Sequence, residues 1–148
     1  MRRLALCLCL VALAAAHCAA SEETADALKS RLPNASPEDR AEISIRIAEL
    51  QLLAADKLYT EGHVAEARAA VDDIVAYSEK ASDAAIESKK HMKNVEISMR
   101  KMAAKLRDIQ RTLAFEDQPP VDQAAHRLED IRTTLLKEMF SDKKDKKK

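Results

Sequence analysis

The side chains that could do chemistry in this chain are few and far apart. Outside the first twenty residues the histidines are His63, His91 and His126, and no HExxH or Glu-x-x-His pair suited to a metal is present. The best candidate cluster is Asp122, His126 and Asp130, at intervals of four residues on one predicted helix face. That face points to solvent, and a single helix gives a metal no enclosing shell of side chains, so we expect no metal site and no cofactor.

Nucleophilic and acid–base catalysis lack their usual partners as well. His91 follows Ser88 by three residues, but Ser88 lies in an apolar stripe, where packing or a hydrogen bond to the backbone is the better interpretation. The pairs Asp72-Asp73 and Glu129-Asp130 are adjacent in predicted helices, so their carboxylates do not face one another. One glycine in 148 residues cannot supply an oxyanion or phosphate loop, and we expect the protein not to be an enzyme.

The first twenty residues have the pattern of a secretory signal. Arg2-Arg3 precedes 13 residues without a charge (4–16), which is shorter than the roughly 20 residues of a membrane span. Cleavage after Ala20 would place small residues at the two positions that a signal peptidase inspects. We therefore expect export to the periplasm or the cell exterior, with a retained signal anchor as the alternative. Cys7, Cys9 and Cys18 all lie here, so the mature chain would have no thiol.

The composition predicts an all-α protein. Aromatic residues make up 3% of the chain, and one glycine cannot build the tight turns of a sandwich or barrel, whereas Ala, Leu, Glu, Lys and Arg are plentiful. We expect a mobile leader over 21–35, a single helical domain over 36–140 and a disordered Lys-rich tail over 141–148. Ser36-Pro37-Glu38-Asp39 is a typical helix start, and a first helix then runs to about Gly62.

A long central helix is the main prediction. From Val64 to Leu113 small and apolar residues recur in alternating steps of three and four, with no Gly or Pro, which predicts one continuous helix over 63–115. The middle of this stripe is small (Ser78, Ala81, Ala85 and Ser88), which either lets another helix approach closely or marks a bend. Pro119-Pro120 then predicts a turn, followed by a third helix. The fold class is thus three helices as antiparallel coiled-coil-like hairpins around one long helix. The alternative is a compact bundle if that helix bends near 78–88.

A local spacing within the first two helices resembles one helical hairpin of a tetratricopeptide (TPR) repeat, over about residues 48–77. The residues that carry it are Ala55, Leu58, Tyr59, Gly62, Val64, Glu66, Ala67, Val71 and Val75. Gln51 stands where the family has a large aromatic residue, Glu79 replaces its closing proline, and no second copy follows after 34 residues. The resemblance implies a hairpin and nothing about ligands.

Charge is segregated along a chain whose formal net charge is zero. Residues 21–88 are acidic and residues 89–111 are basic. The basic surface comprises Lys89, Lys90, Lys93, Arg100, Lys101, Lys105, Arg107 and Arg111. This basic surface either forms ion pairs with acidic residues of the third helix (Glu129, Asp130, Glu138) or attracts an acidic partner, an anionic polymer or a membrane surface.

These features predict an exported interaction or structural protein that works through its helical seam. The apolar anchors of that seam are Met92, Val95, Met99, Met102, Leu106 and Ile109. We expect a homo-oligomer or a helical protein partner, since a thin rod of helices buries little apolar area. The alternative function is an electrostatic adaptor that uses 89–111 and the Lys-rich tail on an anionic surface. Nucleic acid is not expected as a partner, because the basic stretch has no aromatic residue for stacking.

Overall fold

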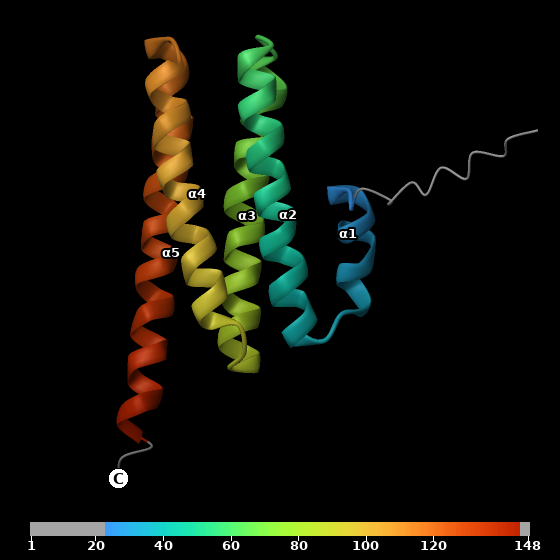
Figure 1. Ribbon diagram of the computed structural model, residues 1–148, viewed down its shortest axis with the longest axis vertical. Coiled ribbons are helices and arrows are strands. Elements are labelled where there is room, and N and C mark those ends of the chain that lie inside the picture. The colour runs from blue at the N-terminus through green and yellow to red at the C-terminus, as the bar shows by residue number, and fades with distance from the viewer. Residues whose placement is uncertain (1–22, 146–148) are drawn as a thin grey trace, which may run out of the picture.

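The computed structural model describes the backbone of residues 23–145 and the side chains of residues 23–141. This part of the chain forms helices and no strand, so the all-α prediction is confirmed (Figure 1). In order, the elements are α1 (Ala25–Arg31), the 3-10 turn η1 (Leu32–Asn34), α2 (Pro37–Thr60), α3 (Val64–Ser88), α4 (Met92–Thr112), the 3-10 turn η2 (Phe115–Asp117) and α5 (Gln118–Asp145). The predicted signal segment and its cysteines lie outside the described residues.

The α2–α3 hairpin forms where local sequence signals place it. The Ser36 hydroxyl accepts a hydrogen bond from the Asp39 N–H (3.1 Å), and Pro37 occupies the first helical position, where no N–H is needed. At the other end Gly62 has φ = 82°, and the N–H groups of Gly62 and His63 donate back to the carbonyls of Tyr59 (3.1 Å) and Leu58 (2.8 Å). This pair of bonds is a Schellman motif, which ends α2 at the position that the sequence predicted.

The continuous helix over 63–115 is wrong, because the chain reverses direction between α3 and α4. Lys89 (φ = 55°) and His91 (φ = 59°) both adopt the left-handed conformation, which no α-helix can contain. The Ser88 hydroxyl donates to the Ala84 carbonyl (2.8 Å) and accepts from the Lys90 N–H (3.2 Å). It thus provides a hydrogen-bond partner for the Lys90 N–H, which lies beyond the end of α3. The reversal follows directly after the small segment that we had considered as a bend, so the bundle alternative describes the fold.

Reversal at Lys89–His91 brings the two hairpins side by side in parallel. Along α2 and α4, Glu42 contacts His91 (3.2 Å), Glu49 accepts from Ser98 (2.7 Å) and Asp56 contacts Lys105 (2.7 Å). Each step is seven residues on both helices and in the same direction, so α2 and α4 run parallel. The ion pairs Arg68–Asp117 (2.6 Å), on α3 and η2, and Glu79–Arg127 (2.7 Å) show the same for α3 and α5.

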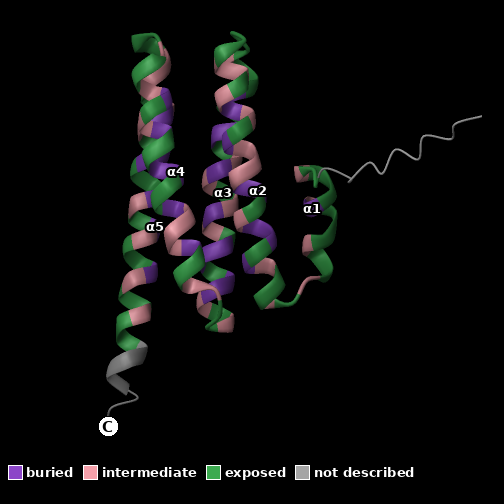
Figure 2. Ribbon diagram, viewed as in Figure 1, coloured by how far each residue is buried: buried purple, intermediate pink, exposed green. Residues whose placement is uncertain are grey.

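The buried residues of the four long helices form the core (Figure 2). The two hairpins differ in the size of the side chains that they bury. The α2–α3 interface buries mostly small side chains, which let the two helices approach closely: Ala41, Ser44, Ala48, Ala55, Ala67, Ala70, Ser78, Ala81, Ala84 and Ala85. The α4–α5 interface buries larger ones, among them Met99, Met102, Leu106, Leu128 and Leu135. The small residues in the middle of the stripe thus serve close packing.

Both ends of the described chain are helical beyond the predicted domain. The leader over 21–35 contains α1, whose Leu28 is buried against Ile43 and Ile47 of α2, so this part of the chain is packed. Lys29 adds an ion pair to Asp73 of α3 (2.7 Å). At the C-terminus α5 continues to Asp145, so it includes residues 141–145 of the predicted Lys-rich tail; residues 146–148 lie outside the described part.

The proline pair is also placed differently from the prediction. Pro119 and Pro120 lie within the first turn of α5, where a missing N–H costs no intrahelical bond. The turn itself precedes them, at Leu113–Asp117, where η2 ends in a hydrogen bond from the Gln118 N–H to the Phe115 carbonyl.

The left-handed conformation of Lys89 predicts an unusual order of substitutions. Lys89→Gly should be more stable than Lys89→Ala by about 1 kcal/mol, because both remove the side chain and only glycine adopts φ = 55° without steric cost. Urea unfolding of the two variants measures the difference. At Lys101, in the middle of α4, the alanine variant should instead be more stable than the glycine variant by a similar amount. The same order at both positions would contradict the reversal.

Burial of Leu106 predicts a large cavity effect. Leu106 is fully buried, so Leu106→Ala should lower the free energy of unfolding by roughly 2–5 kcal/mol in thermal or urea unfolding. Leu53 is 63% exposed, and Leu53→Ala should cost less than about 0.5 kcal/mol. Similar effects at the two leucines would show that α4 does not pack inside its own chain.

Candidate interaction surface

The predicted seam is occupied by the chain's own helices. Val95, Met99, Met102, Leu106 and Ile109 are all buried, and Met92 is half-buried at the edge of the same cluster. These residues contact α5 and the α2–α3 hairpin, so they form the core. A partner of the folded domain therefore meets the outer faces of the helices and not this seam.

Some of the basic residues of 89–111 are neutralised within the chain. Lys105 pairs with Asp56 of α2 (2.7 Å), Arg107 with Glu129 of α5 (3.2 Å) and Arg111 with Asp108 of its own helix (2.9 Å). Three acidic residues were expected to form ion pairs with the basic stretch. Glu129 does, through Arg107, whereas Asp130 and Glu138 form no ion pair with described residues. Lys105 turns instead to α2, which the long-helix prediction had placed far away.

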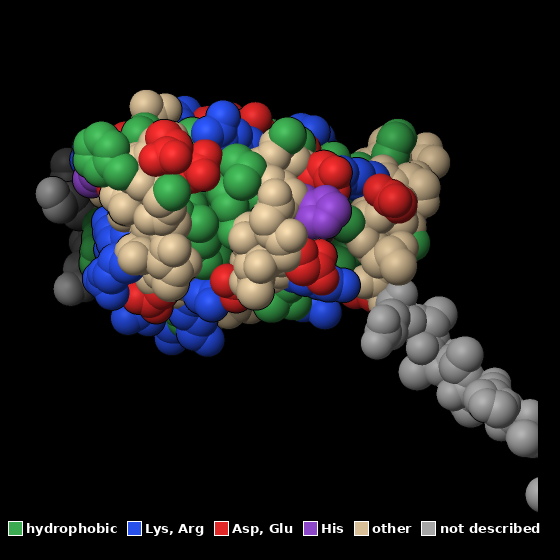
Figure 3. Space-filling model, turned by 90° about the horizontal axis from the view of Figure 1, so that it is seen from above, with side chains coloured by type: hydrophobic (Ala, Val, Ile, Leu, Met, Phe, Trp, Pro, Cys, Tyr) green, Lys and Arg blue, Asp and Glu red, His purple; other side chains and the backbone are tan. Residues whose placement is uncertain are grey.

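Three cations of α4 remain exposed and form no ion pair within residues 23–141: Lys93, Arg100 and Lys101. We refer to these three residues as the α4 basic face. The spacing of seven and eight residues puts them on the outer side of the helix, two turns apart. Lys90, just before α4, is exposed as well. Seen from one end of the bundle, Lys and Arg side chains gather on the side formed by α4 (Figure 3, lower left).

A charged network beside the α4 basic face joins α4 to α5. Arg132 donates to Glu96 (2.6 Å) and contacts Glu129 (3.4 Å), which also accepts from Arg107 (3.2 Å). The hydrogen bond to Glu96 raises the pKa of the Arg132 guanidinium above its ordinary value. The sequence did not reveal this network, because its members come from two helices whose register only the fold sets.

An exposed apolar site lies on α5, toward the end of the bundle at which α4 begins. Phe140 is 59% exposed and lines, with Thr133, Leu136, Lys137 and Ser141, a shallow pocket of about 360 Å³ on α5. Because α4 and α5 are antiparallel and Arg132 faces Glu96, the residues two turns later on α5 lie by the start of α4. The sequence analysis missed this pocket, since Leu136 and Phe140 lie off the apolar stripe of the third helix.

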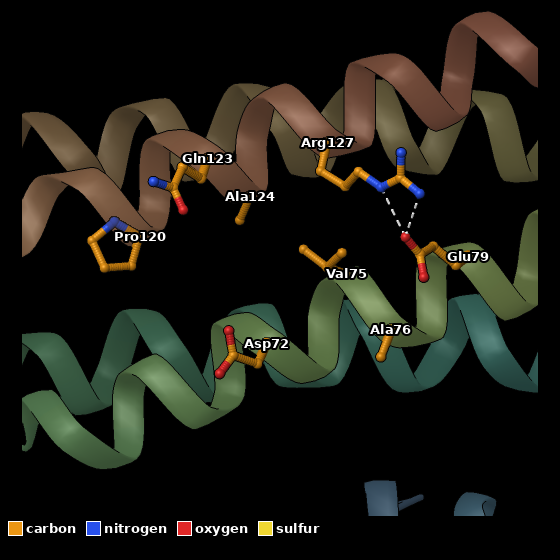
Figure 4. Close-up of a pocket in the computed structure, with 8 residues that line it drawn as sticks. All are labelled: Asp72, Val75, Ala76, Glu79, Pro120, Gln123, Ala124 and Arg127. Carbon is orange, nitrogen blue, oxygen red and sulfur yellow. Dashed lines mark hydrogen bonds and ion pairs between the residues drawn. The ribbon is translucent and has the colours of Figure 1, made fainter.

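A second groove, between α3 and α5, is bridged by an ion pair (Figure 4). Its volume is about 330 Å³, and Val75, Ala76 and Ala124 make up its apolar part. Arg127 reaches across from α5 to Glu79 on α3, and two of its guanidinium nitrogens, Nη2 and Nε, lie 2.7 and 2.8 Å from one carboxylate oxygen. The groove thus contains a charge pair that is already satisfied within the chain.

The candidate catalytic and metal residues do not converge. His126 contacts Asp122 (3.6 Å) on the exposed face of α5, and His63 contacts Glu66 (3.6 Å) at the start of α3. Within the described residues no three His, Cys, Asp or Glu side chains come close enough to hold a metal ion. Ser88 hydrogen-bonds to the backbone, as predicted.

The adjacent acidic pairs serve as structural partners. Asp73 accepts hydrogen bonds from Lys29 (2.7 Å) and from the Gln51 amide (2.9 Å), and so connects α1 and α2 to α3. Glu129 belongs to the α4–α5 network. In both pairs the carboxylate that turns inward meets a cation or an amide and not a second carboxylate.

Comparison with known proteins adds no constraint on the function. The chain matches no protein-family model, no curated protein and no solved structure. Among the described residues no helix combines the length and the apolar character that crossing a membrane requires. Functional inference therefore rests on the geometry of the surfaces described above.

The fold disfavours ionisation of the Tyr59 phenol. Its hydroxyl is buried between the hairpins without a hydrogen-bond partner among the described residues, and this burial raises the pKa of Tyr59 above 10. The neutral phenol is favoured in the folded chain, so its contribution to stability is present below pH 10 and is lost as pH rises through the folded-state pKa.

Replacing Tyr59 should therefore change the alkaline stability of the protein. Tyr59→Phe is expected to be as stable as the parent or more stable at neutral pH, because an unpartnered hydroxyl is removed. It should also lose less stability than the parent between about pH 8 and pH 11. Urea unfolding at both pH values, with Tyr77→Phe as the composition control, measures this. Equal alkaline losses in the parent and Tyr59→Phe would contradict the burial of this hydroxyl.

Proposed function

We propose that the protein is a small helical binding module whose α4 basic face docks an acidic segment of a partner protein. The observation that carries the proposal is the set of three exposed cations on one side of α4 that form no ion pair within residues 23–141. Elsewhere on the same helix the cations form ion pairs within the chain, at Lys105, Arg107 and Arg111. Exposed cations on a rigid helix attract carboxylates and set the orientation of a partner.

The pocket around Phe140 supports a protein segment over a purely ionic ligand. An exposed aromatic ring beside Leu136 offers an apolar anchor point on α5, the helix that packs against α4. Acidic segments with one or two apolar side chains match this combination, since the carboxylates provide attraction and the apolar side chain provides position. A simple polyanion would use only the cations.

Burial of the seam changes how a helical partner or a second copy would bind. Because Met99, Met102 and Leu106 are inside the domain, a partner has to dock on the outside of α4 and α5. We retain export as part of the proposal, on the strength of the basic and apolar pattern of residues 1–20. The role is one of binding and not of catalysis, and reproducible turnover by the purified protein would contradict it.

Charge reversal on the α4 basic face tests the proposal. Poly-L-glutamate probes the cationic part of the site alone, and its binding is measured by isothermal titration calorimetry at low and at physiological salt. The triple variant Lys93→Glu, Arg100→Glu, Lys101→Glu should bind at least about tenfold more weakly than the parent, with an unchanged melting temperature. Raising the salt should weaken parent binding and leave the variant little affected.

A second triple variant, at cations that are ion-paired within the chain, controls for net charge. Arg31→Glu, Arg46→Glu and Lys57→Glu make the same charge change on α1 and α2, and should leave binding within about threefold of the parent. Equal losses in the two triple variants would show that only net charge matters and would overturn the α4 basic face as the site. Binding of the parent to anionic vesicles but not to poly-L-glutamate would replace the protein partner with a lipid surface.

A further inference from the structure

A cleft at the corner of α2, α3 and η1 is separate from the α4 basic face. It has a volume of about 410 Å³ and is lined by Leu32, Pro33, Arg40, Ser44, Lys80, Asp83, Ala84 and Glu87. Because α1 packs on α2, η1 lies beside this hairpin, and its Leu32 and Pro33 line one side of the cleft. The cleft is therefore made from residues that the sequence analysis assigned partly to a mobile leader.

Two buried polar atoms without a partner belong to residues that line this cleft. The Ser44 side chain is completely buried, and its hydroxyl makes no hydrogen bond within the described residues. One turn earlier on α2, the Nε atom of Arg40 is buried and equally unpartnered. Buried polar groups are nearly always paired, because an unpaired one loses its bonds to water without replacement. A ligand with acceptor oxygens would satisfy both atoms.

Charged side chains of both signs line the same cleft. Arg40 and Lys80 bring positive charge, and the Lys80 ammonium lies 4.5 Å from the centre of the Tyr77 ring. Asp83 and Glu87 of α3 bring two carboxylates, of which Glu87 is 3.5 Å from the Arg40 guanidinium. A molecule that carries one negative and one positive group would satisfy both halves, whereas a simple anion would meet two carboxylates.

We propose that this cleft binds a small amino carboxylate, a free amino acid with a short apolar side chain. Its carboxylate accepts hydrogen bonds from Arg40 Nε and the Ser44 hydroxyl, and its ammonium group faces Asp83 and Glu87. Leu32, Pro33 and Ala84 form the apolar wall for the side chain. The volume of the cleft exceeds that of one such molecule, and the remaining space admits water.

L-Leucine is the probe for a test by heteronuclear NMR on the purified protein. Saturable shifts of the Leu32, Ser44 and Ala84 amides are expected, with a dissociation constant below roughly 10 mM. Two analogues separate the charges: 4-methylpentanoate lacks the ammonium group, and 3-methylbutylamine lacks the carboxylate. Each should bind at least about tenfold more weakly than leucine.

Two serine variants separate binding from packing. Ser44→Ala removes the hydroxyl in the cleft, and Ser78→Ala removes the other fully buried, unpartnered serine hydroxyl, which does not line the cleft. Both variants should melt at or above the parent temperature, since each loses an unsatisfied buried group. Leucine affinity should fall at least about tenfold in Ser44→Ala and stay within about twofold in Ser78→Ala.

Several results would overturn the proposal. Absence of saturable shifts with leucine would show that water alone satisfies Ser44 and Arg40. Shifts outside the cleft, or equal affinity losses in the two serine variants, would place the ligand elsewhere. Affinity for 4-methylpentanoate equal to that for leucine would remove Asp83 and Glu87 from the site and reduce it to a carboxylate site.

Discussion

The reversal between α3 and α4 is the constraint on which the arrangement of the four long helices depends. Two residues in the left-handed conformation cost of order 1–3 kcal/mol each, and this cost has to be offset by what the reversal brings together. His91 lies within 3.3 Å of Glu38 and 3.2 Å of Glu42, so the corner is held against the first turns of α2. From there Ser98 and Lys105 continue the contact with α2 at intervals of seven residues. A continuous helix would have left the α4 side of α2 exposed.

Local signals predicted the elements whose boundaries are set locally. The Ser36 cap and the glycine at position 62 act through bonds to their own neighbours, and α2 begins and ends where they stand. The reversal has no glycine or proline, and the contacts of His91 with α2 that hold it are 49 and 53 residues away in sequence. α1 likewise has seven residues and depends on the burial of Leu28 against α2. Both features depend on tertiary contacts, which periodicity does not report.

The same distinction applies to the candidate sites. Periodicity identified the members of the seam correctly, but it could not say whether they would meet another copy or their own chain. Ion pairing of Lys105 with Asp56 and of Arg132 with Glu96 depends on the register between helices, so the unpaired cations could be selected only once that register was known. The cleft at Ser44 could not be predicted from the sequence, because η1 forms one of its sides and the packing of α1 on α2 sets the position of η1. Charge segregation, by contrast, was visible in the sequence and survives on the surface of α4.

The order of the hairpins explains why recognition through charge is the better proposal than exchange of the seam. Stacked helical hairpins need a polar outer face or a cap at each end of the stack. Here α1 covers part of the outer side of α2, while the outer side of α4 and α5 carries the Glu96–Arg132–Glu129–Arg107 network. Within residues 23–141 the exposed large apolar side chains are Leu53, Phe115 and Phe140, which are too few to form a broad face that would recruit a third hairpin. What the α4–α5 end does offer is positive charge at Lys93, Arg100 and Lys101 that is unpaired within residues 23–141, and one exposed aromatic ring on α5. Both features can bind a partner without opening the core.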